Sequence, residues 1–240
     1  MAESTPTPAL SVVMVALNEE QAIAKVIGDI RSVVPDAEVV VVDSSKDRTA
    51  EIAERLGCRV IRQLPARGYG PALHEALQAA HGECVVTIDC DDTYPAEEIP
   101  KLTAKLKEGF DIVSASRLAT RPKAMPVMNY MANRLFALLA SWLCGVGATD
   151  VHTGMRAYRR KLIREFPYDP HGMALPVELL VGPVQKGYRF SEVFIDYRPR
   201  LGETTLKPLE GTIWTLRRLW RWRRFFGRQP QAVARSHDPG

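Results

Sequence analysis

Three aspartates stand within four positions at the end of an apolar run, in the stretch TIDCDDTYPAEEIP at residues 87–100. Adjacent carboxylates repel one another and are poorly placed for a protein core, so water or a cation must satisfy them. The alternating pair Asp89 and Asp91 lets two carboxylates converge on one divalent cation that also takes substrate phosphate oxygens. The alternative is a solvated turn, because Asp is common in turns. We favour the metal site.

Two further acids follow apolar runs. Asp43 ends the run VVVVD, where a carboxylate can accept a hydrogen bond from a nucleotide base or ribose. Its alternative role is a helix N-cap, although Ser45 and Asp47 can already cap the next segment. Glu19 has a similar place after the first apolar run, and its alternative is to complement a helix dipole. We interpret both acids as candidates for ligand binding.

A glycine-rich stretch, ARGYGPA at residues 66–72, leads into a predicted helix and contains Gly70. The backbone amides of such a stretch can face a phosphate or a nucleotide. The stretch matches neither GxGxxG nor the P-loop, so taken alone it indicates an ordinary loop.

The elements that must position these residues alternate along the first half of the chain. Apolar strands without polar alternation, each separated by a helix, are typical of a parallel sheet covered on both faces. We therefore predict an open α/β fold, whose ligands bind beyond the carboxyl ends of the strands, where these acids fall. The expected strands are 10–17, 37–45, 58–63 and 83–89, and the expected helices are 18–33, 46–57 and 70–82. The first helix is expected to bury Ile23, Val26, Ile27 and Ile30.

Size and composition favour one globular domain in a reducing compartment. The chain has 240 residues and 46% hydrophobic content, which is enough for a substantial core. Its four cysteines form no CxxC pair, which favours the cytoplasm. No apolar stretch reaches the length of a bilayer span, and the N-terminus lacks the pattern of a signal peptide. We expect a flexible tail at 1–9 and a disordered tail at 228–240.

Positive charge is concentrated near the C-terminus, where residues 211–240 hold seven Arg and one acid. The stretch TIWTLRRLWRWRRFFGR predicts a basic amphipathic helix over 211–227, a pattern typical of a lipid headgroup surface. Nucleic acid or a protein partner is the alternative. A second apolar stretch, residues 127–147, is interpreted as an ordinary core helix in preference to a membrane element. On the C-terminal helix we expect Arg217, Arg218, Arg221 and Arg224 on one side, and Ile213, Leu216, Leu219, Trp220 and Phe226 on another.

The chain carries an ordered set of motifs that resembles family 2 glycosyltransferases. The motifs are LNEE, VVVDSSKDRTAEIA, RGYGPALHEAL, HGECVVTIDCDDTYPAEEIPKL, DIVSASR, GATDVHTGMRAYRRKLI and RPRLGETTLK. Within that family it is most similar to the dolichyl-phosphate mannose synthase-like branch, over residues 10–210. The resemblance implies a GT-A fold with a Rossmann-like nucleotide-binding half. It also implies a nucleotide-diphosphate sugar donor, Mg²⁺ or Mn²⁺ on the D-x-D motif, and inversion at the anomeric carbon.

The resemblance assigns roles residue by residue. Tyr130 and Thr205 depart from it, because the family usually has basic residues there. The implied nucleotide contacts are Leu17 and Glu19, the acid of the family's DDGS turn is Asp43, the D-x-D motif is Asp89, Cys90 and Asp91, and the arginines of the S-R and GFR motifs are Arg117 and Arg156.

Breaking a sugar–diphosphate bond builds negative charge on the leaving group, so a metal and arginines should stabilise it. Solvated surface arginine is the alternative for each of them. The arginine candidates are Arg117, Arg156, Arg198 and Arg200.

The acceptor decides whether a base is needed. A phosphate acceptor is already anionic, whereas a hydroxyl acceptor requires a general base. Asp150 and Glu178 are the candidate bases for that second case. His152 is a candidate base or metal ligand, and its alternative is an ordinary loop histidine.

We therefore expect an inverting, metal-dependent glycosyltransferase that moves a hexose from GDP-mannose or UDP-glucose to a polyprenyl phosphate. A small-molecule or peptide hydroxyl acceptor is the second hypothesis, and a non-catalytic nucleotide-sugar-binding scaffold is the third. The expected location is the cytoplasmic face of the membrane, with peripheral attachment through the C-terminal helix. We expect no nucleic acid partner, and we leave open a homo-oligomer or a membrane protein partner.

Overall fold

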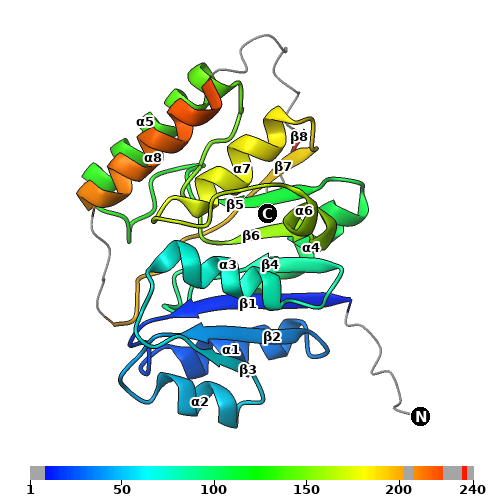
Figure 1. Ribbon diagram of the computed structural model, residues 1–240, viewed down its shortest axis with the longest axis vertical. Helices are drawn as coiled ribbons and strands as arrows, with labels where there is room; N and C mark the ends of the chain where they lie inside the picture. Colours follow the sequence, from blue (N-terminus) through cyan, green and yellow to red (C-terminus); the bar gives the residue numbers. More distant parts are fainter. Residues whose placement is uncertain (1–8, 203–207, 224–233, 237–240) are drawn as a thin grey trace.

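A mostly parallel, eight-stranded sheet forms the centre of the described part of the chain (Figure 1). The computed structural model describes residues 9–202, 208–223 and 234–236. The strand order is β3-β2-β1-β4-β6-β5-β7-β8. The strands are β1 (Leu10–Ala16), β2 (Glu38–Asp43), β3 (Arg59–Arg62), β4 (Cys84–Thr87), β5 (Ile112–Ser116), β6 (Arg156–Arg159), β7 (Phe190–Phe194) and β8 (Ala234–Ser236).

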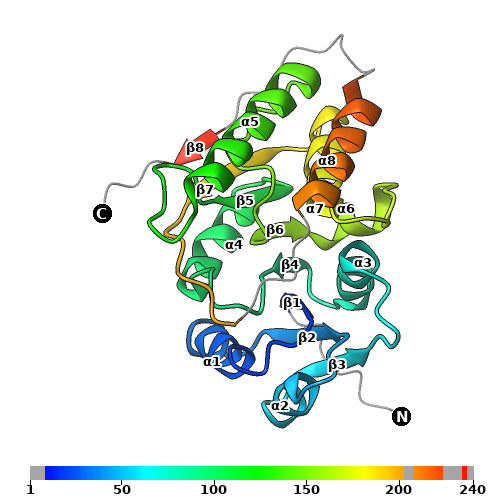
Figure 2. The same ribbon diagram turned by 90° about the vertical axis from the view of Figure 1, so that its left-hand side faces the viewer.

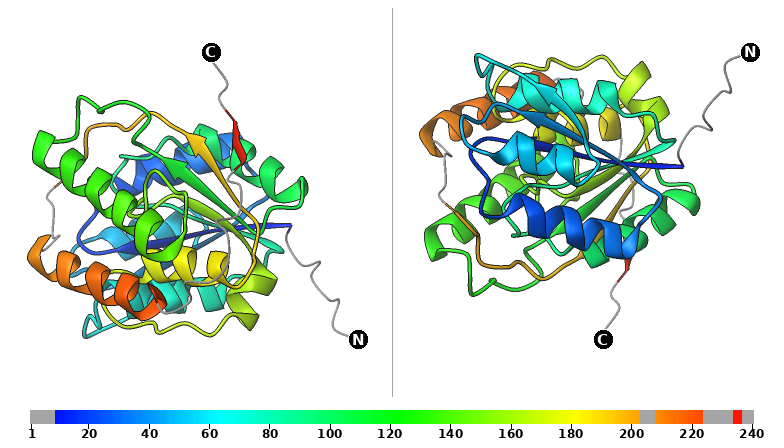
Figure 3. Two further views of the ribbon diagram at one scale, coloured as in Figure 1. Left: turned by 90° about the horizontal axis from the view of Figure 1, so that it is seen from above. Right: turned by 90° about the horizontal axis from the view of Figure 1, so that it is seen from below.

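Helices cover both faces of this sheet, as the views from above and below show (Figure 3). One core cluster joins the sheet to α1, α2 and α4, and the other joins it to α3 and to α5–α8. The helices are α1 (Ile23–Val33), α2 (Thr49–Arg55), α3 (Tyr69–Ala79), α4 (Ile99–Lys107), α5 (Val127–Cys144), α6 (Arg160–Glu165), α7 (Leu175–Gln185) and α8 (Pro208–Trp222), with a 3₁₀ turn at Ala96–Glu98.

The central strands are apolar throughout because both of their faces are buried. In β1, Val12 belongs to one core cluster and the next residue, Val13, belongs to the other. The helix α1 buries the four apolar residues that its spacing predicted, against the first of these clusters. The prediction of an open, mostly parallel α/β sheet with helices on both faces is confirmed.

The strand β6 runs against its neighbours, which the sequence analysis did not predict. It pairs antiparallel with β4 and with β5, so Arg156 at its start lies opposite Thr87 at the end of β4. The segment that enters β6, residues 145–155, therefore reaches the edge of the sheet at which the parallel strands end. This topology supplies a second wall for a site at that edge.

The structure differs from three predictions about single segments, two of them in the C-terminal region. The helix α8 spans Pro208–Trp222, so it begins before the predicted residue 211. The predicted disordered tail is wrong for Ala234–Ser236, which form β8 and pair in parallel with β7. The segment 127–147 is not an ordinary core helix, because one side of α5 is exposed. The predicted flexible residues 1–8 lie outside the described part of the chain.

The helices α5 and α8 contact each other at one end of the molecule (Figure 2). Within the described residues, none of the helices combines the length and the apolar character needed to traverse a bilayer.

Candidate active site

Three carboxylates meet where β1 and β4 end. The two strands are parallel neighbours, so Glu19 after β1 and Asp91 after β4 come close together. The guanidinium of Arg200 bridges them, donating to Asp91 Oδ2 at 2.5 Å and to Glu19 Oε1. Asp89 lies beside this pair, because the charges of Asp91, Arg200 and Glu19 all act on its carboxylate. Its Oδ2 also abuts Gly154, where an added Cβ would lie 2.4 Å away. The D-x-D aspartates and Glu19 thus form one acidic site.

The third aspartate of the cluster has a different role. Asp92 adopts a left-handed backbone conformation with φ of 64°, and its carboxylate accepts a hydrogen bond from Lys25 at 2.8 Å. Asp91 instead caps the following turn, because its Oδ1 accepts hydrogen bonds from Thr93 N at 3.1 Å and Thr93 Oγ1 at 2.6 Å. One oxygen of Asp91 is therefore structural, and the other faces Arg200.

The crowding of carboxylates disfavours their charged forms. Burial, and then the charge of Asp91, raise the pKa of Asp89 to about 7. Burial also raises the pKa of Glu19 to about 7, despite the opposing charge of Arg200. The Oε2 atom of Glu19 is buried and has no hydrogen-bond partner. A cation held by these oxygens would offset the cost of burying the charges of Asp89 and Glu19, and it would give Glu19 Oε2 a partner.

The donor set suits a divalent cation that shares its shell with a ligand. Carboxylate oxygens are the preferred ligands of Mg²⁺ and also bind Mn²⁺. Among the described residues, no group of three or more His, Cys, Asp or Glu side chains is arranged to hold a metal ion by itself. Asp89 and Asp91 fit a cation whose remaining ligands are water and substrate oxygens.

Residues 195–202, which we call the strap, follow β7 and cross the acidic site. Backbone hydrogen bonds fix the strap: Arg198 N donates to Thr93 O at 3.0 Å and Leu201 N donates to Asp91 O at 2.9 Å. Arg200 faces the acidic site from the strap, whereas Arg198 pairs with Glu97 on the outer side. Of the two arginines predicted in this segment, only Arg200 reaches the site.

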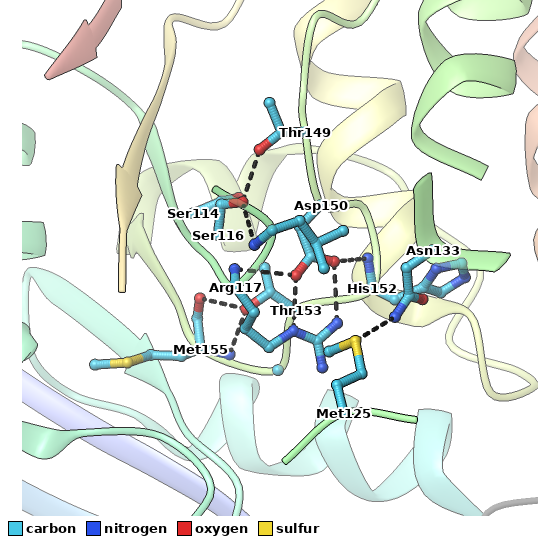
Figure 4. A network of polar contacts seen from close by, with 12 residues as sticks. Ser114, Ser116, Arg117, Met125, Asn133, Thr149, Asp150, His152, Thr153 and Met155 are labelled. Carbon is cyan, nitrogen blue, oxygen red and sulfur yellow. Dashed lines mark hydrogen bonds and ion pairs between the residues drawn. The ribbon is translucent and has the colours of Figure 1, made fainter. Parts of the chain in front are cut away.

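Arg117 and Asp150 form a buried, two-pronged ion pair next to the acidic site (Figure 4). Arg117 Nε donates to Oδ2 at 2.7 Å and Nη2 donates to Oδ1 at 3.0 Å. The guanidinium also lies 5.8 Å from the ring centre of Tyr94 and 5.2 Å from that of Tyr197. Burial opposes ionisation of Asp150, but the charge and hydrogen bonds of Arg117 outweigh it and lower the pKa of this carboxyl. Asp150 is therefore poorly suited to act as a base.

Glu192 supports the loop that carries Asp150, a role the sequence analysis missed. Its buried carboxylate accepts hydrogen bonds from Thr149 N at 2.9 Å and, more weakly, from Asp150 N at 3.4 Å. Burial raises the pKa of Glu192 to about 7. The only signal in the sequence was an acid within the apolar strand β7. Tyr94 and Tyr197 were missed as well, although Tyr94 directly follows the aspartate cluster.

The structure gives His152 a packing role. Its Nε2 hydrogen-bonds Thr215 Oγ1 of α8 at 2.8 Å, and its ring meets that of Phe136 of α5 edge to face. Burial lowers the pKa of His152 to about 4, so the ring is neutral at physiological pH. This placement between two helices argues against the expected roles of His152 as a metal ligand or base.

Arg156 and Gly70, both predicted to bind the ligand, have contacts within the protein. Arg156 is fully buried and donates to Ser114 Oγ at 2.6 Å and to Pro176 O at 2.5 Å, so it holds the interior together. At Gly70 an added Cβ would lie 2.2 Å from Gly172 O, so this glycine permits close packing against a neighbouring loop. Arg156 is therefore too deeply buried to reach a ligand phosphate, whereas phosphate binding by the backbone amide of Gly70 stays a prediction.

Glu178 is the second candidate base, and the structure pairs it with arginine. It is fully buried on α7, with Arg218 Nη1 3.3 Å away and Arg221 Nη1 3.6 Å away. Arg218 also pairs with Asp169 at 2.9 Å. Arg218 was expected on the outer basic side of α8, and that expectation is wrong because the residue is 2% exposed.

The remaining predicted contacts occupy the same edge of the sheet or its core. Leu17 is 37% exposed directly after β1. Asp43 is buried at the end of β2 and accepts hydrogen bonds from Ser45 Oγ and Arg62 Nη1, each at 2.5 Å. Cys90 belongs to the hydrophobic core, so only the aspartates on either side of it face the site. Tyr130 lies on α5, and Thr205 lies outside the described residues.

An open α/β sheet with a D-x-D pair at the end of a central strand defines a glycosyltransferase of the GT-A type. The chain belongs to glycosyl transferase family 2, whose family model matches residues 11–166. It is 47% identical over 203 residues to a dolichyl-phosphate hexose transferase from Haloferax volcanii, across 84% of this chain and 88% of that relative. It is also 33% identical to an undecaprenyl-phosphate 4-deoxy-4-formamido-L-arabinose transferase from Pseudomonas paraeruginosa, across 66% of this chain and 49% of that relative.

Solved structures agree with this family. Glucosyl-3-phosphoglycerate synthase from Mycobacterium tuberculosis with UDP matches with a TM-score of 0.72 and 26% identity, covering 90% of this chain and 80% of that one. The same synthase with Mn²⁺, UDP and phosphoglyceric acid gives a TM-score of 0.71 and 27% identity, covering 90% and 78%. The GT-A fold is thereby confirmed.

Proposed function

We propose that this glycosyltransferase moves a hexose from a nucleotide-diphosphate sugar to a polyprenyl phosphate, with inversion at the anomeric carbon. The observation that carries the proposal is the acidic site of Glu19, Asp89 and Asp91, bridged by Arg200. The relatives named for dolichyl phosphate and undecaprenyl phosphate support a polyprenyl phosphate as the acceptor.

Asp89 and Asp91 would hold Mg²⁺ or Mn²⁺ at this site. When bound, the cation would offset the negative charge that grows on the departing diphosphate. Arg200 keeps a second positive charge at the same carboxylates, and we assign it to the donor phosphates. Solved relatives with Mn²⁺ and UDP-glucose support a donor of the UDP-glucose type, with GDP-mannose as the other candidate.

The ion pairs of the two candidate bases favour a phosphate acceptor over a hydroxyl acceptor. Asp150 is locked in an ion pair with Arg117, and Glu178 is held by Arg218 and Arg221. A hydroxyl acceptor needs a base to take its proton, and neither acid is free for that task. A phosphate acceptor needs no base, so it is compatible with both ion pairs. We also place the protein peripherally on the cytoplasmic face of the membrane, where a polyprenyl phosphate would be presented.

The direct test is mass spectrometry of the products made with Mn²⁺, a short-chain polyprenyl phosphate, and UDP-glucose or GDP-mannose. A hexosyl polyprenyl phosphate that forms only with metal is the expected result, and Asp91→Asn should abolish it. Metal-dependent release of free hexose without a lipid product would point to a hydroxyl acceptor. Donor binding without any turnover would support the scaffold hypothesis.

A further inference from the structure

The helix α5 turns a row of large apolar side chains to solvent. These side chains recur every three or four positions, so they lie along one side of the helix. The other side is buried against the core through small residues, Ala137, Ala140 and Cys144. Met128 is 77% exposed and Trp142 is 73% exposed, which is unusual for such residues on a soluble domain. The full row is Val127, Met128, Met131, Leu135, Leu138 and Trp142.

The neighbouring helix α8 carries a second exposed row. The two helices pack side by side at the end of the molecule remote from α2 (Figures 1 and 2). We call their exposed apolar residues together the α5/α8 face. Large exposed apolar side chains on two neighbouring helices are typical of an interaction site. The row on α8 is Leu209, Ile213, Leu216 and Trp220.

The charges on this face are nearly all positive. Arg134 on α5 and Arg217 and Arg221 on α8 are exposed beside the apolar rows. The helix α5 contains no acid, and α8 contains only Glu210. Apolar side chains with tryptophans and an arginine border complement an anionic lipid surface, with the rings at headgroup level.

We infer that the α5/α8 face docks the protein on an anionic phospholipid surface, with α5 contributing the larger apolar row. This extends the expected attachment from the C-terminal helix to a pair of helices. It also explains why α5 keeps methionine, leucine and tryptophan side chains in water, at a cost in solubility that a membrane surface removes.

A second copy of the chain fits this face less well. Symmetric self-association brings the same patch against itself, so Arg134, Arg217 and Arg221 would meet a surface of the same sign. A coiled-coil partner would need complementary charges beside the apolar seam and three or more heptads. The helix α5 has 18 residues and a single charged side chain.

The two helices that carry the face also contact the loop that holds Asp150. The helix α5 follows the segment of Arg117 and precedes that of Asp150, and His152 contacts both α5 and α8. Docking would therefore present the active site to a phosphate carried at the membrane surface. This last step rests on the proposed function, whereas docking on lipid does not.

Tryptophan fluorescence tests the inference on the unmodified full-length chain. All four tryptophans, Trp142, Trp214, Trp220 and Trp222, belong to α5 and α8. We expect phosphatidylcholine vesicles with phosphatidylglycerol and brominated acyl chains to quench the emission, and pure phosphatidylcholine vesicles to quench it far less. The Trp142→Phe/Trp220→Phe double variant should lose most of the quenching yet still float with the vesicles, because phenylalanine keeps the apolar contact.

Vesicle flotation of single variants measures how much the apolar row and the arginines each contribute to lipid binding. Leu138→Glu should weaken binding by at least about tenfold, since it places a carboxylate in the apolar row. Arg217→Gln should weaken binding by about fivefold and reduce its salt dependence. The matched control is Leu56→Glu, because Leu56 is 42% exposed at the end of α2 on the opposite side of the molecule. Circular dichroism checks that each variant is folded.

The outcomes separate the face from the proposed activity. Vesicle binding that Leu138→Glu removes, and that Asp91→Asn leaves intact, supports the face even if no polyprenyl phosphate is glycosylated. Transfer to a short-chain polyprenyl phosphate without vesicle binding overturns the inference that the α5/α8 face docks on lipid, and it leaves the proposed function standing. A stable dimer in light scattering that Leu138→Glu dissolves, without vesicle binding, overturns it in favour of self-association.

Discussion

The two halves of the molecule treat charge in opposite ways. In the first half, up to the end of β5, the core is apolar and the acids Glu19, Asp89 and Asp91 crowd together at the edge of the sheet. In the second half, buried charges such as Glu178 and Arg218 lie in ion pairs in the interior, 3.3 Å apart, while α5 and α8 expose apolar side chains. Crowded carboxylates mark the ligand site in the first half, and exposed apolar side chains mark the inferred docking site in the second.

The largest effect is expected at the acidic site. Asp91→Asn removes the charge of the carboxylate that faces Arg200 but keeps an oxygen for the hydrogen bonds from Thr93. We expect transferase turnover to fall by about 10²–10³-fold, as on loss of a group that stabilises the transition state. The assay is product formation under saturating Mn²⁺, with Asp36→Asn on an exposed turn as the control. Full activity in Asp91→Asn would mean that the crowded carboxylates are not the site of transfer.

The next effect concerns the paired charges of the second half. Arg218→Met leaves Glu178 buried with only the more distant Arg221, so the free energy of unfolding should fall by about 3 kcal/mol. Urea unfolding measures this loss. Arg218→Met combined with Glu178→Gln should recover part of it, because the fully buried charge of Glu178 is then absent. A loss below about 0.5 kcal/mol in the single variant would show that the pair is not structural.

A pH effect is expected at Glu192, which supports the loop of Asp150. Its pKa is about 7 in the folded protein, above the ordinary value of 4.5, so folding binds a proton more tightly. The associated stability is complete below about pH 4.5 and is lost as the pH rises through about 7. From pH 5 to pH 8 the wild type should lose on the order of 2 kcal/mol more than Glu192→Gln, as measured by urea unfolding. Identical pH profiles would contradict this assignment.

The smallest effect is expected where the two halves meet. Gly154 lies at the entry to β6, and a Cβ there would press on the carboxylate of Asp89. Gly154→Ala should therefore weaken Mn²⁺ binding by about tenfold with little change in stability, as calorimetric titration and thermal unfolding would report. Gly28→Ala is the matched control, since an added Cβ at this glycine of α1 meets nothing within 4 Å. Equal Mn²⁺ affinity in both variants would separate Asp89 from the metal.

The fold of the first half could be predicted because its signals are local. The spacing of Ile23, Val26 and Ile30 and the uninterrupted valines of β2 each follow from burial on one or two faces. The antiparallel β6 could not be predicted in this way. Its four residues contain two arginines, and its neighbours β4 and β5 are distant in sequence.

The site was predicted best where chemistry is concentrated in a short stretch. The D-x-D aspartates converge with Glu19 as the strand ends suggested. The partners of Arg156, Glu178 and His152 within the chain could not be predicted, because a polar residue in sequence looks the same whether its partner is a ligand or a distant segment of the same chain. Glu192 was missed for the same reason, although it is an acid within the apolar strand β7.

The position of β6 has a consequence for how the chain folds. Strands β4 and β5 are consecutive in the chain but are not neighbours, and β6 must be inserted between them before one sheet exists. Until residues 156–159 are in place, two half-sheets have unpaired edges, which slows folding and invites aggregation. Arg156 begins this last strand and also donates to the carbonyl of Val151 in the loop that carries Asp150. Closing the sheet and assembling the second wall of the active site are therefore a single folding event.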